Sequence, residues 1–191
     1  MQTIKKFWYH LKRVCIHKYW VCKYCFQLGI PWRGIIHDLS KFSWTEFSRG
    51  VKYYTPNGSP IPEEKRLNNG VSIAWQHHKG RNSHHYEYWT DNYDSGTTCI
   101  QMPFEDAVEM ICDYLGAARA YWGKAFTFNK EYDWWLTKVD KIKMHPHTKG
   151  FVSSVLHTLK DEDTRVSLNM YFNKHYLKYL YNNVVSELYN L

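Results

Sequence analysis

Histidine and aspartate residues recur through the first 113 positions of this chain in a pattern that could bind metal ions. They share an apolar or histidine-rich setting and are His17, His37, Asp38, His77, His78, His84, His85 and Asp113. Imidazole and carboxylate ligands together suit iron, manganese, zinc, cobalt or nickel, and such a site needs no thiolate. We therefore expect one or two divalent transition metal ions to bind around the adjacent pair His37-Asp38.

The apolar setting of His17 and Asp113 supports this hypothesis. His17 shares a helical stripe with Val14 and Val21, and Asp113 follows the apolar run 110–112. A charged carboxylate in an apolar helix is costly unless it is paired or bound to a metal. A single histidine on such a face is more often a hydrogen-bonded core residue, so the group as a whole carries the prediction.

Helical periodicity predicts the elements that must position these groups. The predicted helices share that period and span about 3–28, 31–41, 43 onward, 63–79, 103–122, 129–142, 148–160 and 164–189. Gly29 is expected to end the first helix and Pro31 to begin the second. Ser43 and Glu46 form a capping-box pattern. Turn residues predict loops at 55–62 and 90–102 and a tight turn or helix end at 81–85, and no segment demands a sheet.

Composition and charge are those of a basic globular protein. The chain has 191 residues, 25 Lys plus Arg against 18 Asp plus Glu, and a formal net charge of +7. That charge favours phosphate-bearing partners, although a generic basic surface explains it equally well. Nine Trp, sixteen Tyr and nine Phe can fill a core or stack on flat ligands. No basic block marks a nucleic-acid arm, so sequence-specific nucleic-acid binding is not expected.

The five cysteines indicate a reducing, cytoplasmic compartment. Cys22-x-x-Cys25 has neither the second CxxC of a zinc site nor the preceding strand of a redox motif, so plain buried thiols are expected. Lysines interrupt every apolar run near the N-terminus. The chain is therefore predicted to carry no signal peptide or membrane span and to have no membrane partner.

The order of these residues resembles the HD-domain superfamily, which is all-helical and mostly comprises metal-dependent phosphohydrolases. The resemblance rests on His17, then Ile35-Ile36-His37-Asp38-Leu39-Ser40-Lys41-Phe42, then later histidines and a late aspartate. It implies that His17, His37, Asp38 and Asp113 are the core ligands. His78, His84 and His85 match the extra histidines of members that hold two or more metals. The resemblance thus implies an all-α, HD-domain-like bundle of seven or eight helices.

A narrower resemblance is to an uncharacterised HD-like family of bacteria and phages, over residues 10–160. It rests on Pro31-Trp32-Arg33-Gly34, His37-Asp38-Leu39-Ser40-Lys41-Phe42, Arg81-Asn82-Ser83-His84-His85 and Glu109-Met110-Ile111-Cys112-Asp113. It favours His78 over His77 as a ligand, and it implies the host cytoplasm if the chain is phage-encoded. We expect residues 1–160 to form the HD-like metal-binding domain. Residues 161–191 would be a helical extension that packs on the same domain or mediates a homodimer.

The leading expectation is a phosphohydrolase, a monoesterase or diesterase, that acts on a nucleotide or related phosphoester through a metal-activated hydroxide. Asp38 would ligate the metal, and Lys41 is expected to face the substrate phosphate unless it is simply solvated. Arg81 could clamp the phosphate or form a structural ion pair.

Three acidic residues are assigned supporting roles. Glu109 would accept a hydrogen bond from a ligand histidine. Glu46 is expected to cap its helix rather than transfer a proton, and Asp106 to complement a helix dipole.

Two other classes of function remain open. HD-like diiron oxygenases use histidine and aspartate ligands in the same arrangement, so the ligands alone do not separate them from hydrolases. A non-catalytic protein that binds or sequesters a nucleotide would also fit the charge and the aromatic content.

Overall fold

The computed structural model describes residues 2–94 and 96–184, and within them it is predominantly helical. Nine α-helices account for most of these residues: α1 Thr3–Gln27, α2 Pro31–Ile36, α3 Trp44–Lys52, α4 Pro60–Leu67, α5 Ile73–Lys79, α6 Phe104–Trp122, α7 Phe128–Leu136, α8 Pro146–Leu159 and α9 Lys174–Asn182. Four short 3₁₀ helices join them: η1 Leu39–Phe42, η2 Tyr86–Trp89, η3 Gly123–Ala125 and η4 Leu168–Met170. The expectation of a helical protein is confirmed, with more and shorter helices than predicted. Among the described helices, none has the length and apolarity that a transmembrane span requires.

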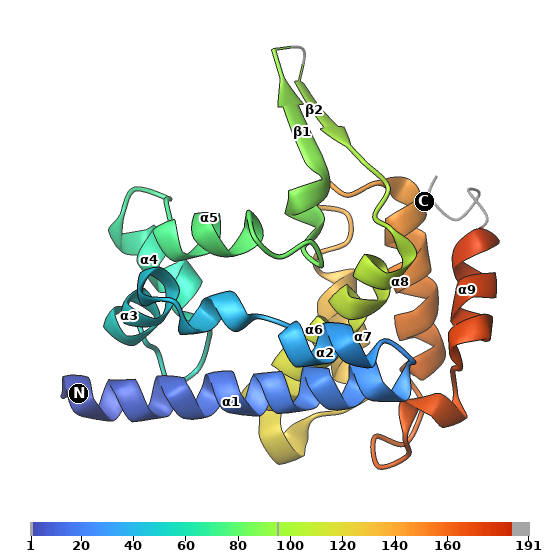
Figure 1. The fold of residues 1–191 in the computed structure, drawn as a ribbon, viewed down its shortest axis with the longest axis horizontal. Helices are drawn as coiled ribbons and strands as arrows, with labels where there is room; N and C mark the ends of the chain where they lie inside the picture. The colour runs from blue at the N-terminus through green and yellow to red at the C-terminus, as the bar shows by residue number, and fades with distance from the viewer. Residues whose placement is uncertain (1, 95, 185–191) are drawn as a thin grey trace.

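The long helix α1 lies along one edge of the molecule and packs against the central helix α6 (Figure 1). It ends as predicted, because Gly29 adopts the left-handed conformation, φ 77°, just past its last turn. Gly116 of α6 allows the close approach, since a Cβ at that position would lie 2.4 Å from Val21 Cγ2. Two of the elements that carry predicted ligands are therefore held together by tight backbone packing.

The helix predicted over 31–41 is wrong beyond Ile36. α2 ends there, and Asp38 has a left-handed backbone with φ 54° before η1 begins. Aspartate tolerates this conformation better than most residues. In a continuous helix the side chains of His37 and Asp38 would diverge by about 100°. The break in the helix lets the two adjacent side chains, His37 and Asp38, take directions that a continuous helix would not allow.

The helix predicted over 63–79 is in fact two helices. Asn69, φ 50°, and Gly70, φ 85°, are both left-handed and separate α4 from α5. α4 also begins earlier than expected, at Pro60, inside the predicted loop 55–62. Ser59 caps it by accepting a hydrogen bond from the Ile61 amide. Proline at the first helical position explains why a turn-rich segment can begin a helix.

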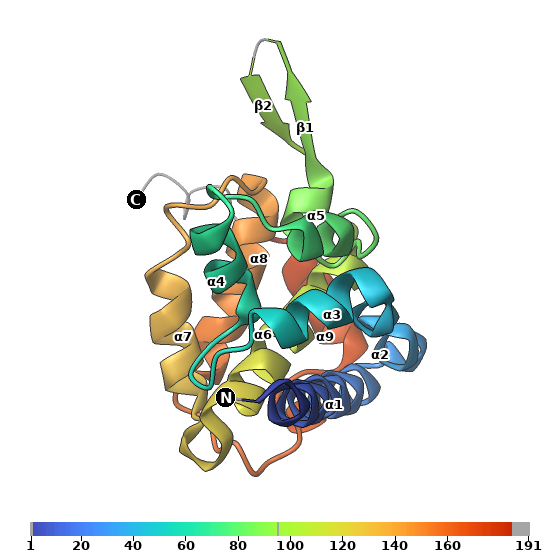
Figure 2. The ribbon, with the colours of Figure 1, turned by 90° about the vertical axis from the view of Figure 1, so that its left-hand side faces the viewer.

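Residues 90–102 were expected to be a loop, but most of them form a β-hairpin. β1 Thr90–Tyr93 pairs antiparallel with β2 Gly96–Cys99, with Thr90 opposite Cys99. The hairpin projects away from the helices (Figures 1 and 2), and β2 is largely exposed. A strand with no buried face has no apolar alternation, so periodicity could not reveal it.

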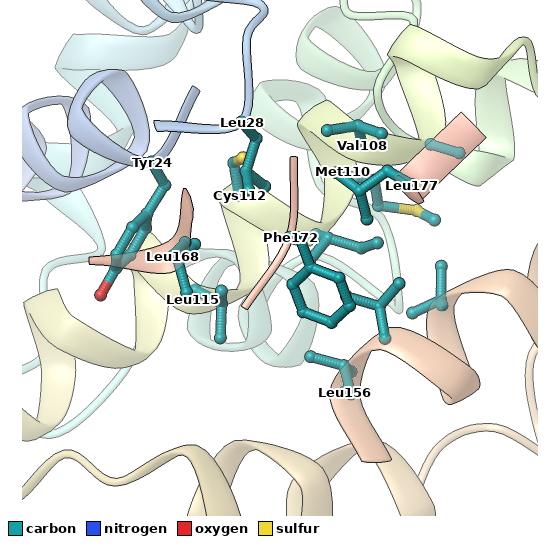
Figure 3. Close-up of a cluster of buried hydrophobic side chains, with 14 of the residues drawn as sticks. Tyr24, Leu28, Val108, Met110, Cys112, Leu115, Leu156, Leu168, Phe172 and Leu177 are labelled. Carbon is teal, nitrogen blue, oxygen red and sulfur yellow. The ribbon is translucent and has the colours of Figure 1, made fainter. Parts of the chain in front are cut away.

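The main core lies between α1, α6, α8 and the C-terminal segment (Figure 3). Phe172 and Leu177 from the C-terminal segment pack in the same cluster as Leu115 and Leu156. The helix predicted over 164–189 is confined, among the described residues, to α9, because residues 164–173 form turns and η4; residues 185–191 lie outside the description. The helices predicted over 129–142 and 148–160 correspond to α7 and α8, with shifted ends.

The cysteines only partly follow the expectation of buried thiols. All five are free, and Cys25 and Cys112 are buried in the core. Cys15 is exposed and Cys22 is half-buried. Cys22 lies beside α2, where Gly34 packs against its backbone.

Candidate metal centre

The seven residues predicted as metal ligands lie together in one largely buried cluster. They come from α1, the α2–η1 break, the end of α5, the turn that follows it, and α6: His17, His37, Asp38, His78, His84, His85 and Asp113. They form two groups of four residues, and in each group the potential ligand atoms all lie within 4.8 Å of one another. Asp38 belongs to both groups. His77, the alternative to His78, is in neither group.

The first ligand set consists of His17, His37, Asp38 and Asp113. Nε2 of His17 lies 3.2 Å from Asp38 Oδ2 and 3.1 Å from Asp113 Oδ1. Nε2 of His37 lies 3.1 Å from Asp38 Oδ2 and 3.5 Å from Asp113 Oδ1. The two Nε2 atoms are 3.3 Å apart.

These separations fit a set of metal ligands. Ligand atoms about 2.1 Å from an ion lie about 3.0 Å apart in an octahedron and about 3.4 Å apart in a tetrahedron. Charge-assisted hydrogen bonds between nitrogen and oxygen are shorter, at about 2.7–2.9 Å. The spacing in the first set, 3.1 to 3.5 Å, therefore matches the edges of a coordination shell better than a close hydrogen-bonded network.

The second ligand set consists of Asp38, His78, His84 and His85. One atom of each residue is buried and has no hydrogen-bond partner: Asp38 Oδ1, His78 Nε2, His84 Nε2 and His85 Nε2. A buried polar atom without a partner is costly. Four such atoms that converge on one place could hold a cation, because nitrogen lone pairs and a carboxylate oxygen all favour a positive charge.

Asp38 joins the two sets through different oxygens. Its Oδ2 faces His17 and His37, whereas its Oδ1 lies 3.2 Å from His78 Nε2 and 3.4 Å from His84 Nε2. The side chain is almost completely buried. If both sets held ions, Asp38 would contribute one oxygen to each set.

Glu109 of α6 holds one histidine from each set. Its Oε1 accepts hydrogen bonds from Nδ1 of His37, 2.8 Å, and of His84, 3.1 Å. Its other oxygen pairs with the Arg33 guanidinium at 2.9 Å. With Nδ1 donating, the Nε2 atoms of both rings point into the cluster. This is the position expected for Glu109.

Asp106 does more than the predicted helix-dipole role. It is buried, accepts two hydrogen bonds from Arg33, at 2.7 and 3.1 Å, and accepts another from Ser83. Ser83 precedes His84 in the turn after α5. Asp106 therefore ties that turn to α6. The sequence expectation missed this because Arg33 lies 73 positions away.

Glu46 was expected mainly to complete a capping box, and that expectation is wrong. Ser43 does cap α3, since its hydroxyl accepts from the Glu46 amide at 3.4 Å. The Glu46 carboxylate, however, accepts hydrogen bonds from Nδ1 of His77, 2.7 Å, and of His78, 2.8 Å. Glu46 thus accepts the Nδ1 hydrogen bond of His78, as Glu109 accepts those of His37 and His84.

Burial and charge together shift the pKa values of the cluster. Burial alone would lower the pKa of His37, but the Asp38 charge and three carboxylate hydrogen bonds raise it well above its usual value. Burial would raise the pKa of Asp38, yet the charges of His37 and Lys41 hold it well below its usual range. Burial would also raise the pKa of Asp113, but hydrogen bonds from His17 and His37 outweigh it and hold the pKa well below its usual value. The aspartates are therefore ionised and able to bind a cation.

Lys41 and Arg81 were both predicted to contact a substrate phosphate, and they lie in different places. Lys41 contacts Asp38 Oδ2 and lines the cavity beside the cluster. Burial lowers the pKa of Lys41, but the Asp38 charge outweighs it and raises the pKa to about 12. Arg81 is exposed, donates to the His77 carbonyl oxygen at 3.3 Å and is not among the residues that line the cavity.

A cavity of about 360 Å³ opens from the cluster. Pockets of about 300–1,000 Å³ are typical of small-molecule sites. Its walls combine ligand residues with aromatic and basic side chains that the sequence analysis did not single out: His10, Arg13, Arg49, Trp75, Tyr121 and Trp134. Burial and the nearby charges of Lys41 and Arg13 lower the pKa of His10 to about 4, so this ring is neutral at pH 7. The sequence did contain a signal for His10, because it lies seven residues before His17 and therefore on the same face of the predicted helix.

The two arginines in the cavity wall differ in how many contacts their guanidinium groups already make with the chain. Arg13 donates to the carbonyl oxygens of Thr55, Pro56 and Gly58 and thereby holds the loop before α4. Arg49 pairs with Glu64 at 2.6 Å through one nitrogen. Arg49 thus retains donors for a ligand, whereas Arg13 acts mainly on the chain itself.

No curated protein and no solved structure matches this chain. One family, described as a family of unknown function (DUF5662), matches residues 6–158. The matched segment contains both ligand sets, Glu46 and Glu109, and it ends before α9 begins. Because the match covers well over half of the sequence, this chain belongs to the DUF5662 family.

Proposed function

We propose that this chain is a metal-dependent phosphohydrolase of the HD type that acts on a nucleotide or a related small phosphoester. The observation that carries the proposal is the sharing of Asp38 by two four-ligand sets at the end of a cavity of about 360 Å³. The order of the ligands along the chain and the predominantly helical fold also support an HD-like arrangement.

The donor set fits divalent transition metals, with five histidines and two aspartates and no thiolate. His17, His37, Asp38 and Asp113 would hold one ion, and Asp38, His78, His84 and His85 a second. Such ions would lower the pKa of a water molecule and neutralise charge on a phosphoryl group.

The chain's own residues would bind and orient the substrate. Lys41 places a positive charge where the cluster meets the cavity, so it would attract the phosphoryl oxygens. Trp75, Tyr121 and Trp134 offer flat apolar walls suited to a nucleobase. Arg49 adds a second positive charge to the cavity lining. Trp75 packs against His78 and His85, so an aromatic group beside the phosphate fits this lining.

The test combines metal analysis with an activity screen on the purified chain. We expect close to two metal ions per chain, together with turnover in a phosphatase and phosphodiesterase screen across nucleotides. Asp38→Ala should abolish both, whereas His175→Ala, an exposed histidine outside the cluster, should change neither. Full metal content and full activity in Asp38→Ala would refute the proposal.

Two other functions use the same ligands, and the same assay separates them. An HD-like diiron oxygenase is the second candidate, because histidine and aspartate ligands at two sites also suit iron. Iron content, an O₂ requirement and activity on a polyol or phosphonate would favour it, and turnover under strict anaerobiosis would exclude it. A nucleotide-binding protein without turnover would return its nucleotide intact after long incubation with metal.

A further inference from the structure

The outer face of α1, opposite the ligand cluster, has an unusual charge. The first 37 residues of the chain contain no aspartate or glutamate. They contain seven basic residues: Lys5, Lys6, Lys12, Arg13, Lys18, Lys23 and Arg33. This number equals the formal net charge of the whole chain, +7. Arg13 lines the cavity and Arg33 pairs with Asp106 and Glu109, so the outer face of α1 itself carries the exposed Lys5, Lys12 and Lys23.

The outward stripe of α1 alternates lysines with large apolar side chains. It consists of exposed residues three or four positions apart: Lys5, Trp8, Lys12, Cys15, Tyr19, Lys23 and Phe26. At 1.5 Å per residue the stripe is about 32 Å long. The buried residues of α1, among them Val14, His17 and Val21, fall on the opposite side. α1 runs along the lower edge of the molecule in Figure 1 and is seen nearly end-on in Figure 2.

α2 extends this surface with further exposed apolar groups. It packs beside α1 through Gly34, and Lys18 donates to the carbonyl oxygen of Ile35 at 2.8 Å. Trp32 is 68% exposed, Ile35 46% and Ile36 43%. We call the α1 stripe together with these three residues the N-terminal face.

The chemistry of the N-terminal face restricts its partner. Six exposed large apolar side chains lie on this face, a larger group than single scattered residues: Trp8, Tyr19, Phe26, Trp32, Ile35 and Ile36. The uniform positive charge disfavours a second copy of the same face. Nucleic acid would use the lysines and stack on Trp8 and Tyr19, but it would leave Ile35 and Ile36 in water. An anionic bilayer accommodates all of them, with lysines at the headgroups and tryptophan and aliphatic groups just below.

We propose that the N-terminal face binds the surface of an anionic lipid bilayer, with α1 lying in the plane of the headgroups. This interaction is independent of the metal centre, which faces the other side of α1. It would bring the cavity close to a membrane without any spanning segment.

Co-sedimentation of the full chain with sucrose-loaded vesicles tests the proposal. We expect binding to phosphatidylcholine vesicles that contain 30% phosphatidylglycerol, and none to phosphatidylcholine alone or in 0.5 M salt. The triple variant Lys5→Glu, Lys12→Glu, Lys23→Glu should weaken binding about a hundredfold or more. The matched control reverses three exposed lysines after α7, Lys138→Glu, Lys141→Glu, Lys143→Glu, and should bind nearly as the parent does.

Insertion is measured separately by quenching of tryptophan fluorescence with brominated lipid. We expect quenching in anionic vesicles that is reduced in Trp8→Phe, a change at an exposed position that leaves the fold intact. No binding to the anionic vesicles, or equal losses in the two triple variants, overturns the proposal. So does a preference for a single-stranded oligonucleotide over the vesicles at equal phosphate concentration, which would identify the partner as nucleic acid.

Discussion

The two ligand sets share Asp38 but differ in how the protein supports them. The first set lies on the packed helices α1 and α6 and at the α2–η1 break, and its atoms already contact one another. The second set comes from the end of α5 and the turn after it, and its atoms are buried without partners. Both sets have similar spacings, 3.1–3.5 Å in the first and 3.2 and 3.4 Å from Asp38 Oδ1 in the second, but only the first forms hydrogen bonds among its own ligand atoms. Without an ion, the desolvation of the second set is therefore less well offset. The second site should consequently depend more on its supporting residues.

Asp38→Asn tests what the two sets share and should have the largest effect. Asparagine keeps the shape but loses the charge that both sets use. We expect metal content to fall from about two ions per chain to below one, and activity to fall at least 10³-fold. Elemental analysis and steady-state assays check this result. An Asp38→Asn protein with two tightly held ions would mean that Asp38 does not bridge.

His85→Ala tests the second set alone. Because His85 belongs to that set only, one ion should be lost and one kept, with activity reduced about 10²-fold or more. His77→Ala is the matched control, since His77 neighbours the cluster but contributes to neither set. Equal metal loss in the two variants would contradict the assignment of the second set. Native mass spectrometry counts the ions directly.

Glu46→Gln and Glu109→Gln separate the sets through the carboxylates that orient the histidines. Glu109 holds His37 and His84, so its loss should weaken both ions, by about 10- to 100-fold in affinity. Glu46 holds only His78 within the cluster, so its loss should weaken only the second ion by a similar factor. Competition with a chelator gives both affinities. If Glu46→Gln weakened both ions equally, the supposed independence of the two sets would be wrong.

Glu131→Gln should alter stability rather than metal content. Burial and the charge of Asp113 raise the pKa of Glu131 from its usual 4.5 to about 8. Between these values the folded chain keeps a proton that the unfolded chain releases, so the free energy of unfolding falls as pH rises. From pH 5 to pH 8 the loss is on the order of 4 kcal/mol.

Denaturant unfolding of the metal-free chain at several pH values measures this slope. Glu131→Gln should flatten it and should be more stable than the parent at pH 8. An ion in the first set would offset the Asp113 charge, so added metal should flatten the slope of the parent as well. An unchanged slope in the variant would show that Glu131 is not protonated in the folded state.

What the sequence determined by itself was local or periodic. The 3.6-residue period and Gly29 predicted α1 closely, and Pro103 and the acidic first turn predicted α6. Apolar surroundings and the resemblance to HD proteins named the seven residues that the fold brings together. These features depend on residues a few positions apart or on their order, which sequence displays directly.

Only the tertiary structure decided how those residues are supported. The Glu46 carboxylate could form a local cap or reach 31 and 32 positions along the chain, and it does the latter because His77 and His78 offer stronger donors in a buried setting. Asp106 pairs with Arg33, while Arg81 donates to the His77 carbonyl oxygen and does not line the cavity. The left-handed turn at Asp38 is equally invisible in a helical pattern. Each outcome is a competition between local and distant partners, and it is settled by burial, which a sequence alone does not contain.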